Sequence, residues 1–212
     1  MEHDLSKAEK MRLFFEELWR KGDPWSLDTS EFERAKYVRQ IELLGDQRFE
    51  RVLEIGCGAG AFTALLSRQA DHITAIDISP TAISTAKRRL GGSTIVELRE
   101  ANIMEEHIPS LGPWDLIVMS ETIYYLGWLY PFFDVAWLAS KLFHSTRDHG
   151  SFLMANTYGE FGDYLVCPWI IRTYRDLFVN VGYCVGREET FRGSKDGVTL
   201  DVLMSLFRKR PA

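Results

Sequence analysis

Three closely spaced glycines follow a short apolar run near residue 55, and this segment is the clearest indication of chemistry in the chain. Residues 51–61 read Arg-Val-Leu-Glu-Ile-Gly-Cys-Gly-Ala-Gly-Ala, so Gly56, Gly58 and Gly60 come directly after a buried-looking strand. Glycines allow the backbone to approach a ligand at distances that any Cβ would prevent. The helix that follows directs its free N–H groups and its positive dipole end at that ligand. The segment therefore predicts a site for a small, partly anionic cofactor.

Two carboxylates accompany this loop. Glu54 lies two residues before the first glycine, and Asp77 lies near the end of the next predicted strand. Gly56, Gly58 and Ala61 also fit the dinucleotide fingerprint G-x-G-x-x-G/A, and Asp77 lies about where such a unit has its ribose-binding carboxylate. An alternative role for Asp77 is a solvated cap of the helix that follows. The glycine pattern alone thus leaves a nicotinamide cofactor open.

The elements that must position these residues are those of one α/β domain. With 212 residues, 46% of them hydrophobic, the chain can bury one such core but is short for two. Short β-rich runs alternate with helical segments, which predicts βαβ units and a parallel sheet. The five runs are Val52–Ile55, Ile73–Ile78, Thr94–Leu98, Asp115–Ser120 and Phe152–Asn156. Ser79-Pro80 is typical of a helix start, and Gly91-Gly92 of its end.

The two ends of the chain differ from this alternation. Residues 7–20 carry an apolar stripe at helical spacing, and Ser30 with Glu33 forms a predicted capping box that opens a second helix to about Leu44. We therefore expect residues 1–50 to form a helical cap and residues 51–212 the α/β core of a single domain. The runs 183–191 and 199–207 are joined by a short polar segment, which predicts an antiparallel hairpin.

Charge and apolar patterning argue against several classes of function. The formal net charge is −5 and basic residues are scattered, so the basic face typical of nucleic-acid-binding proteins is not expected. The N-terminus does not resemble a signal peptide, and no apolar run approaches the roughly 18–20 residues that span a bilayer. Three widely separated cysteines favour neither disulfides nor a metal site. We expect a cytoplasmic protein without a membrane anchor or a bound metal.

The segment Val52–Gly60 resembles the first motif of class I S-adenosylmethionine-dependent methyltransferases, and the closing hairpin is similar to theirs. The resemblance implies a Rossmann-like α/β fold: a seven-stranded, mostly parallel sheet with a C-terminal antiparallel hairpin and helices on both faces. It implies S-adenosyl-L-methionine as cofactor and S-adenosyl-L-homocysteine as product. An NAD-dependent oxidoreductase remains the alternative from another class, although such an enzyme would need a substrate domain for which this chain leaves little room.

The same resemblance implies a set of cofactor-binding residues. Asp77 would accept hydrogen bonds from both ribose hydroxyls, and Asn102 would present its carbonyl to the adenine amino group. An aspartate is often found in the family where Asn102 stands, which puts that contact in question. The cofactor set drawn from the loop and the strand ends is Glu54, Gly56, Cys57, Gly58, Gly60, Asp77, Ile78, Asn102, Ile103 and Ser120.

A closer resemblance concerns residues 23–37, Asp-Pro-Trp-Ser-Leu-Asp-Thr-Ser-Glu-Phe-Glu-Arg-Ala-Lys-Tyr. This segment looks like the N-terminal signature of the nodulation protein S family, whose members N-methylate the free amine of a deacetylated chitooligosaccharide. The resemblance implies a cap that closes over cofactor and acceptor, with Trp25 and Arg34 as cofactor contacts and Arg34 toward the carboxylate. Other expectations for these side chains are packing for Trp25 and solvent exposure for Arg34.

Methyl transfer from a sulfonium is an in-line displacement for which the protein supplies orientation and desolvation. A neutral acceptor amine loses a proton, so a carboxylate or phenol near the methyl group is expected. Glu121, Tyr124 and Tyr158 are the catalytic candidates, and capping of the next helix is the alternative for Glu121. O-methylation, or N-methylation of a different small metabolite, remains open. The acceptor is expected to be a small molecule or an oligosaccharide, and the oligomeric state is left open, with a monomer as one option.

Overall fold

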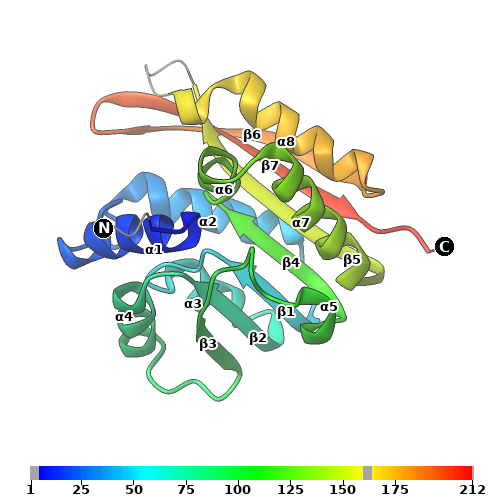
Figure 1. Ribbon diagram of the computed structural model, residues 1–212, viewed down its shortest axis with the longest axis horizontal. Coiled ribbons are helices and arrows are strands. Elements are labelled where there is room, and N and C mark those ends of the chain that lie inside the picture. The colour runs from blue at the N-terminus through cyan, green and yellow to red at the C-terminus, as the bar shows by residue number, and fades with distance from the viewer. Residues whose placement is uncertain (1–4, 160–163, 212) are drawn as a thin grey trace.

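The computed structural model describes residues 5–159 and 164–211, and a single seven-stranded sheet forms its centre (Figure 1). The strand order is β3-β2-β1-β4-β5-β7-β6. Strands β1 to β5 pair in parallel, whereas β7 is antiparallel to both β5 and β6. The predicted mostly parallel sheet with its closing antiparallel hairpin is therefore confirmed. The strands are β1 (Phe49–Ile55), β2 (Ala70–Asp77), β3 (Val96–Glu100), β4 (Trp114–Ser120), β5 (Thr146–Tyr158), β6 (Cys184–Lys195) and β7 (Val198–Arg208).

Helices precede the sheet and connect its strands. Ser79 accepts a hydrogen bond from the Ala82 N–H and starts α4, as its sequence indicates. Ser30 likewise accepts from the Glu33 N–H at the start of α2, but the reciprocal half of the predicted capping box is missing because the Ser30 N–H bonds the Ser26 carbonyl. The helices are α1 (Lys7–Arg20), α2 (Glu31–Leu44), α3 (Ala61–Leu66), α4 (Pro80–Leu90), α5 (Ile108–Leu111), α6 (Ile123–Leu129), α7 (Phe132–Ser145) and α8 (Pro168–Asn180), with a 3₁₀ turn η1 (Tyr164–Val166).

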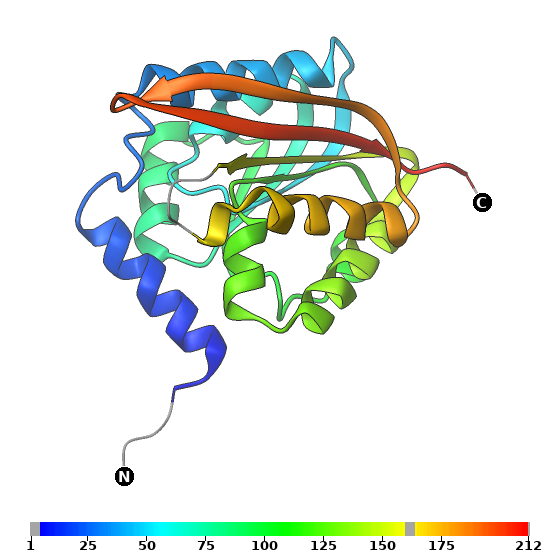
Figure 2. The ribbon, with the colours of Figure 1, turned by 90° about the horizontal axis from the view of Figure 1, so that it is seen from above.

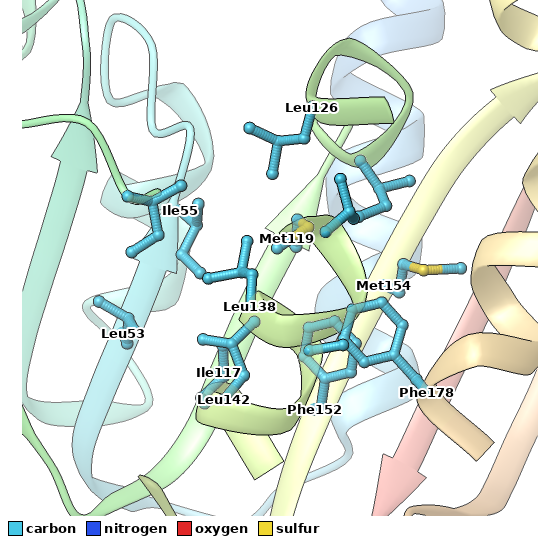
Figure 3. Close-up of a cluster of buried hydrophobic side chains, with 14 of the residues drawn as sticks. Leu53, Ile55, Ile117, Met119, Leu126, Leu138, Leu142, Phe152, Met154 and Phe178 are labelled. Carbon is cyan, nitrogen blue, oxygen red and sulfur yellow. The ribbon is translucent and has the colours of Figure 1, made fainter. Parts of the chain in front are cut away.

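Both faces of the sheet are covered, and each cover has its own apolar core. Side chains of β1, β4 and β5 alternate between the faces, so Leu53 and Ile55 point to α6, α7 and α8 while Val52 points to α2 and α3. Figure 3 shows the first core, where Ile117, Met119 and Phe152 from the strands meet residues of α6, α7 and α8. Burial on both faces explains why the central strands are near-continuous apolar runs.

The closing hairpin has a tighter connection than its sequence suggests. Residues 192–197 are expected as a polar connection, but β6 continues to Lys195 and β7 begins at Val198. Only Asp196 and Gly197 form the turn, with φ angles of +52° and +79°. Positive φ at both central positions is the type I′ geometry that Asp-Gly favours in two-residue hairpins. The extension places Lys195 at the tip of the hairpin, next to the cap.

The N-terminal helices pack on two different parts of the core. Helix α1 lies beside α4, and α2 lies along the hairpin strands β6 and β7 (Figure 2). The second of these helices ends at Leu44 and β1 begins at Phe49, so the sheet starts slightly before the expected division after residue 50. Within the described ranges, no helix has the length and apolar character needed to cross a membrane.

Candidate active site

The carboxyl ends of β1, β2 and β4 meet the two cap helices around a cavity of about 290 Å³. This is the edge of a parallel sheet at which ligands bind in open α/β folds. Three groups of side chains form its walls: the strand ends and their loops, the aromatic residues of the cap, and a set of charged residues. Predicted site residues that line it are Trp25, Gly56, Cys57, Gly58, Asp77, Ile78, Asn102, Ile103, Ser120, Glu121 and Tyr124.

The glycine loop is held to the end of β2 by its own backbone. The N–H groups of Gly56 and Cys57 both donate to the Ile76 carbonyl, at 2.8 and 3.0 Å. Gly56 has φ +77°, and a Cβ there would overlap the Thr122 hydroxyl. A Cβ at Gly58 would lie 3.0 Å from the Trp19 ring. Gly56 and Gly58 therefore cannot carry larger side chains without displacing the loop from its present position.

Asp77 completes this arrangement. One carboxylate oxygen accepts from the Gly58 N–H and the other from the Ser79 N–H, each at 2.9 Å. Burial raises the pKa of Asp77, and these backbone N–H groups oppose that shift. Asp77 thus ties the glycine loop to the start of α4 and also lines the cavity. Its two expected roles, ligand contact and local capping, are compatible with each other.

Glu54 and Gly60 lie outside the cavity wall. The Glu54 side chain is buried on the sheet face that α2 and α3 cover, where burial, reinforced by the Asp77 charge, raises its pKa to about 8. Gly60 forms the N-cap of α3 with φ +75°, and a Cβ there would lie 3.1 Å from the Cβ of Ala86 in α4. Glu54 is thus buried within the core, and Gly60 allows α3 and α4 to approach each other closely.

The wall that follows β3 is largely apolar. Ala101 and Ile103 line it together with Asn102, and Ile78, which follows β2, lines the same cavity. The Asn102 side-chain NH₂ donates to the Tyr130 hydroxyl at 2.9 Å, and its side-chain carbonyl accepts from the Met104 N–H at 3.1 Å. The carbonyl that the sequence assigns to a ligand is therefore already engaged by the backbone.

Glu121 stands at the end of β4 in a left-handed backbone conformation, with φ +55°. Its carboxylate accepts hydrogen bonds from the Thr157 N–H at 3.1 Å, the Thr157 hydroxyl at 2.9 Å and the Tyr124 hydroxyl at 2.9 Å. Lys36 from α2 adds a charged contact at 3.2 Å. A non-glycine residue at positive φ is uncommon and is retained where the surrounding contacts fix it. Glu121 is thus a carboxylate fixed in the wall of the cavity.

Sequence reasoning missed a group of buried charges behind Glu121. Lys36 lies 2.6 Å from the Glu33 carboxylate, and Lys195 at the hairpin tip lies 2.8 Å from its other oxygen. Lys195 also donates to the Trp25 carbonyl at 2.6 Å. All of these residues line the cavity. The available signal was the i, i+3 pair Glu33 and Lys36 on the buried side of a helix, where charges are rare.

Aromatic rings of the cap and of α6 form another part of the cavity wall. Phe15 and Trp19 project from α1, and Trp25 lies in the loop after it; their ring centroids are 6.5 Å (Phe15–Trp25) and 5.5 Å (Trp19–Trp25) apart. Tyr125 from α6 meets Phe15 edge-on, with centroids 5.0 Å apart. All four rings line the cavity, and the cluster joins the cap to the core. Trp25 therefore both packs between the cap and the sheet and faces the cavity.

Besides Glu54 and Gly60, two further predicted site residues, Arg34 and Tyr158, do not line the cavity. Arg34 is exposed on α2 and donates to the Asp28 carbonyl at 3.0 Å. Tyr158 lies near the end of β5, where its hydroxyl is 3.2 Å from that of Thr190 on β6. Among the described residues, no group of three or more His, Cys, Asp or Glu side chains has the arrangement of a metal site. The cavity offers a backbone loop, an aromatic wall and the carboxylates of Glu33, Asp77 and Glu121.

A family model described as nodulation protein S (NodS) matches residues 6–129 of the chain. Among curated proteins, the chain is 36% identical to nodulation protein S of Rhizobium tropici over 106 residues, which are 50% of this chain and 44% of that protein. It is 35% identical over 101 residues to malonyl-[acyl-carrier protein] O-methyltransferase of Paenibacillus sp., covering 45% of this chain and 36% of that protein. The matches thus span about half, or less, of these relatives' length.

Among solved structures, the fold is similar to that of N-methyltransferase NodS from Bradyrhizobium japonicum, whose crystal structure contains S-adenosyl-L-homocysteine. The TM-score is 0.79 with 22% sequence identity, over 95% of this chain and 99% of that one. At this identity the likeness concerns the fold. It confirms that the seven-stranded sheet with its terminal hairpin is the Rossmann-like fold of methyltransferases.

Proposed function

Because the chain belongs to the nodulation protein S (NodS) family, we propose that it is an S-adenosylmethionine-dependent methyltransferase that N-methylates the free amine of a deacetylated chitooligosaccharide or a related amino sugar. The observation that carries the proposal is the single cavity that is lined by the glycine loop, by Asp77 and by the fixed carboxylate of Glu121. One part of this cavity suits a nucleoside with an amino-acid tail, and the other suits a hydrogen-bond donor.

The residues present fit this cofactor. Gly56 and Gly58 line the cavity with main-chain atoms, and a Cβ at either position would meet Thr122 or Trp19, so only glycine keeps the loop on this path beside the ligand. Asp77 offers carboxylate oxygens for ribose hydroxyls, and Ile78 and Ile103 offer an apolar wall for adenine. When bound, S-adenosylmethionine supplies a methyl group that is already activated as a sulfonium. Glu54 and Gly60 support this part of the site without contacting the ligand.

The acceptor end requires a group that orients an N–H or O–H donor. Glu121 has this role in the proposal: its fixed carboxylate accepts a hydrogen bond from the neutral amine and aligns the nitrogen lone pair with the methyl group. Burial, together with the neighbouring Glu121, raises the pKa of the Tyr124 phenol well above its ordinary value. Tyr124 therefore stays protonated and orients Glu121 as a donor rather than acting as a base. Arg34 and Tyr158 have no part in the proposal.

A transfer assay tests the activity. The protein is incubated with S-adenosylmethionine labelled in its methyl group and with chitotetraose that has been deacetylated at its non-reducing end. We expect label in the sugar, and fully acetylated chitotetraose as the control should remain unlabelled because it has no free amine. Equal labelling of both sugars would contradict N-methylation of an amine, and labelling of neither would contradict the proposed acceptor.

Cofactor binding is tested separately by thermal unfolding, because a ligand that binds only the folded state raises the melting temperature in a concentration-dependent way. S-adenosylhomocysteine should stabilise the protein and NAD should not. Stabilisation by NAD alone would support the oxidoreductase alternative instead. The three cysteines, all within the described ranges, form no disulfide, in keeping with the proposed cytoplasmic location.

O-methylation of another small metabolite is the second candidate, which the similarity to an O-methyltransferase favours. The glycine loop serves both reactions equally, since it concerns the cofactor alone. A panel of amine and hydroxyl acceptors in the same labelled assay separates them, because a hydroxyl acceptor of comparable size would then take up the label faster than the amino sugar.

A further inference from the structure

Four charged side chains form a continuous line through the interior, in the order Glu121, Lys36, Glu33 and Lys195; we name this line the charge chain. The Lys36 and Glu33 side chains are 3% and 6% exposed. The ion pairs measure 3.2, 2.6 and 2.8 Å along the chain. Signs alternate along it, so each carboxylate lies next to at least one cation and the four formal charges sum to zero.

Such an arrangement is costly for a fold. Taking charged groups out of water costs several kcal/mol per ion, and well-packed apolar residues of similar size are often equally stable. Lys36 already lies beside the Phe32 and Tyr37 rings, which an apolar side chain would also pack against. The Glu33 carboxylate pairs with the two lysines and does not accept a hydrogen bond from the Ser30 N–H, as it would in a complete capping box. Stability alone therefore does not account for the charge chain.

The two ends of the charge chain lie in different parts of the site. At one end is Glu121, the carboxylate fixed against Thr157 in the wall of the cavity. At the other end Lys195 donates to the main-chain carbonyl of Trp25, in the cap loop that supplies part of the aromatic wall. The charge chain thus joins the end of β4, helix α2, the hairpin tip and the cap loop.

We propose that Lys36 is a positioning residue for methyl transfer, which holds the Glu121 carboxylate against Thr157 in the orientation that the acceptor requires. Through Glu33 and Lys195, this orientation also depends on the position of the cap loop that contains Trp25. The effect on transfer rests on the proposed function, whereas the position of Glu121 does not. The groups facing Glu121 are Lys36 from α2, Tyr124 from α6 and Thr157 from β5. Lys36 is the only cation among these three, so its removal leaves a carboxylate with neutral donors alone.

Lys36 is suited to this role because it remains charged. Burial lowers its pKa, but the Glu121 and Glu33 carboxylates outweigh burial and raise that pKa above the ordinary value for lysine. The cation therefore persists over the whole range in which an enzyme of this kind is assayed. The position of Glu121 should accordingly not depend on pH through Lys36.

The test compares Lys36→Met with Lys36→Arg, Lys195→Met and the control Arg39→Met. Arg39 lies one turn further along α2 and pairs with Glu189 of β6 at the surface, so its loss removes an α2–β6 ion pair outside the cavity. We expect Lys36→Met to lower kcat by roughly 100-fold, the order found for a misplacement of about 1 Å at a reacting centre. The dissociation constant for S-adenosylhomocysteine should change less than threefold. Lys36→Arg should have a kcat at least fivefold higher than that of Lys36→Met. Lys195→Met should lower kcat by about tenfold, and Arg39→Met should have the kcat of the unchanged protein.

Crystal structures of Lys36→Met and Arg39→Met with S-adenosylhomocysteine give a measurement that does not need an active acceptor. We expect the Glu121 carboxylate to leave the Thr157 hydroxyl in Lys36→Met and to keep it in Arg39→Met. A Glu121 carboxylate that stays on Thr157 in Lys36→Met overturns the inference, whether or not transfer is observed. A third outcome separates the two proposals: no protein, including the unchanged one, transfers the methyl group, but Glu121 is displaced in Lys36→Met as expected. That outcome would contradict the proposed acceptor and support the inference. If Lys36→Met does not fold, Lys36→Gln takes its place in both measurements.

Discussion

Glu16 of the first helix accepts two hydrogen bonds from Thr81 at the start of α4, from the backbone N–H at 3.1 Å and from the hydroxyl at 2.6 Å. The Ser79 hydroxyl donates to the same carboxylate at 2.7 Å. A side chain of the cap thus occupies the N-terminal end of a core helix, where carboxylates are favoured. Because Ser79 also donates to Asp77, the cap is fixed directly beside the glycine loop.

We predict that Glu16→Gln loosens α1 and weakens S-adenosylhomocysteine binding, because Phe15 and Trp19 of the same helix line the cavity. Burial opposes ionisation of Glu16, but hydrogen bonds from Thr81, Ser79 and Arg20 lower its pKa to about 2. Its contribution to stability is therefore present above about pH 4.5 and lost as the pH falls toward 2. We expect a loss of about 1–3 kcal/mol in the free energy of unfolding at pH 7.

Urea unfolding at pH 7 and pH 3 measures this effect, and the difference between the two proteins should shrink at pH 3. Glu17→Gln is the matched control, since its exposed side chain pairs with Lys21 at the surface of the same helix. A difference that stays constant between the two pH values would mean that the charge of Glu16 is not what fixes the helix.

Gly56 and Gly45 allow the cost of backbone conformation to be separated from the cost of a steric clash. Their φ angles are +77° and +76°. A Cβ at Gly56 would overlap Thr122, whereas a Cβ at Gly45 would have no other atom within 4 Å. We predict that Gly45→Ala costs about 1 kcal/mol of unfolding free energy and leaves ligand binding unchanged. Gly56→Ala should cost a further 1–3 kcal/mol or so, because overpacking displaces the loop. Calorimetric titration with S-adenosylhomocysteine should show loss of binding in Gly56→Ala alone.

Replacing Asp77 should affect the ligand more than the fold. We expect Asp77→Ala to weaken S-adenosylhomocysteine binding by roughly 100-fold, since hydrogen bonds to a charged group contribute about 1.5–3 kcal/mol each. The Gly58 and Ser79 N–H groups would lose their acceptor, so Asp77→Asn should retain more of the affinity. Asp71→Ala, on the exposed part of the same strand, is the control. Unchanged affinity in Asp77→Ala, measured by calorimetry, would mean that the ribose lies elsewhere.

Glu54 should make the protein less stable as the pH rises. Its pKa is about 8 in the folded state, chiefly because of burial, against 4.5 in an exposed chain. Between these values the unfolded chain releases the proton and the folded chain keeps it, so the free energy of unfolding falls by up to about 1.4 kcal/mol per pH unit. Glu54→Gln should remove this decline between pH 5 and pH 8, as followed by urea unfolding. Glu50→Gln, exposed on the same strand, should retain it.

The parts of the site that sequence could predict are those with local signals. The glycine loop, Asp77 and the start of α4 lie within one βαβ unit, where residue type and spacing are enough. The hairpin was also predicted, but its Asp196-Gly197 turn was overlooked within a longer polar segment. That dipeptide is the strongest short-range signal for a two-residue hairpin, and it would have extended β6 to Lys195.

Helix α2 shows a second kind of limit. Its buried side follows the spacing of Phe32, Glu33, Lys36 and Gln40, which places Arg34 on the opposite, exposed side. This helical periodicity is present in the sequence, but it is difficult to recognise because two of the residues on the buried side are charged. Apart from the pair that they form with each other, their partners lie far away in sequence: Glu121 is 85 residues from Lys36, and Lys195 is 162 residues from Glu33. Pairings at such separations depend on the fold and leave no local pattern.

The two-residue turn at Asp196-Gly197 restricts how the length of the hairpin can vary during evolution. Successive residues of a strand face opposite sides of the sheet, so adding or removing one residue in β6 would point Ser194 or Asp196 toward Glu33 and turn Lys195 away. Insertions of an even number of residues within the strands preserve the facing of Lys195 although they move it along the hairpin. Relatives with a longer or shorter hairpin should therefore keep this lysine on the side of the sheet that faces α2 when the difference is even, whereas an odd step would turn it away from Glu33.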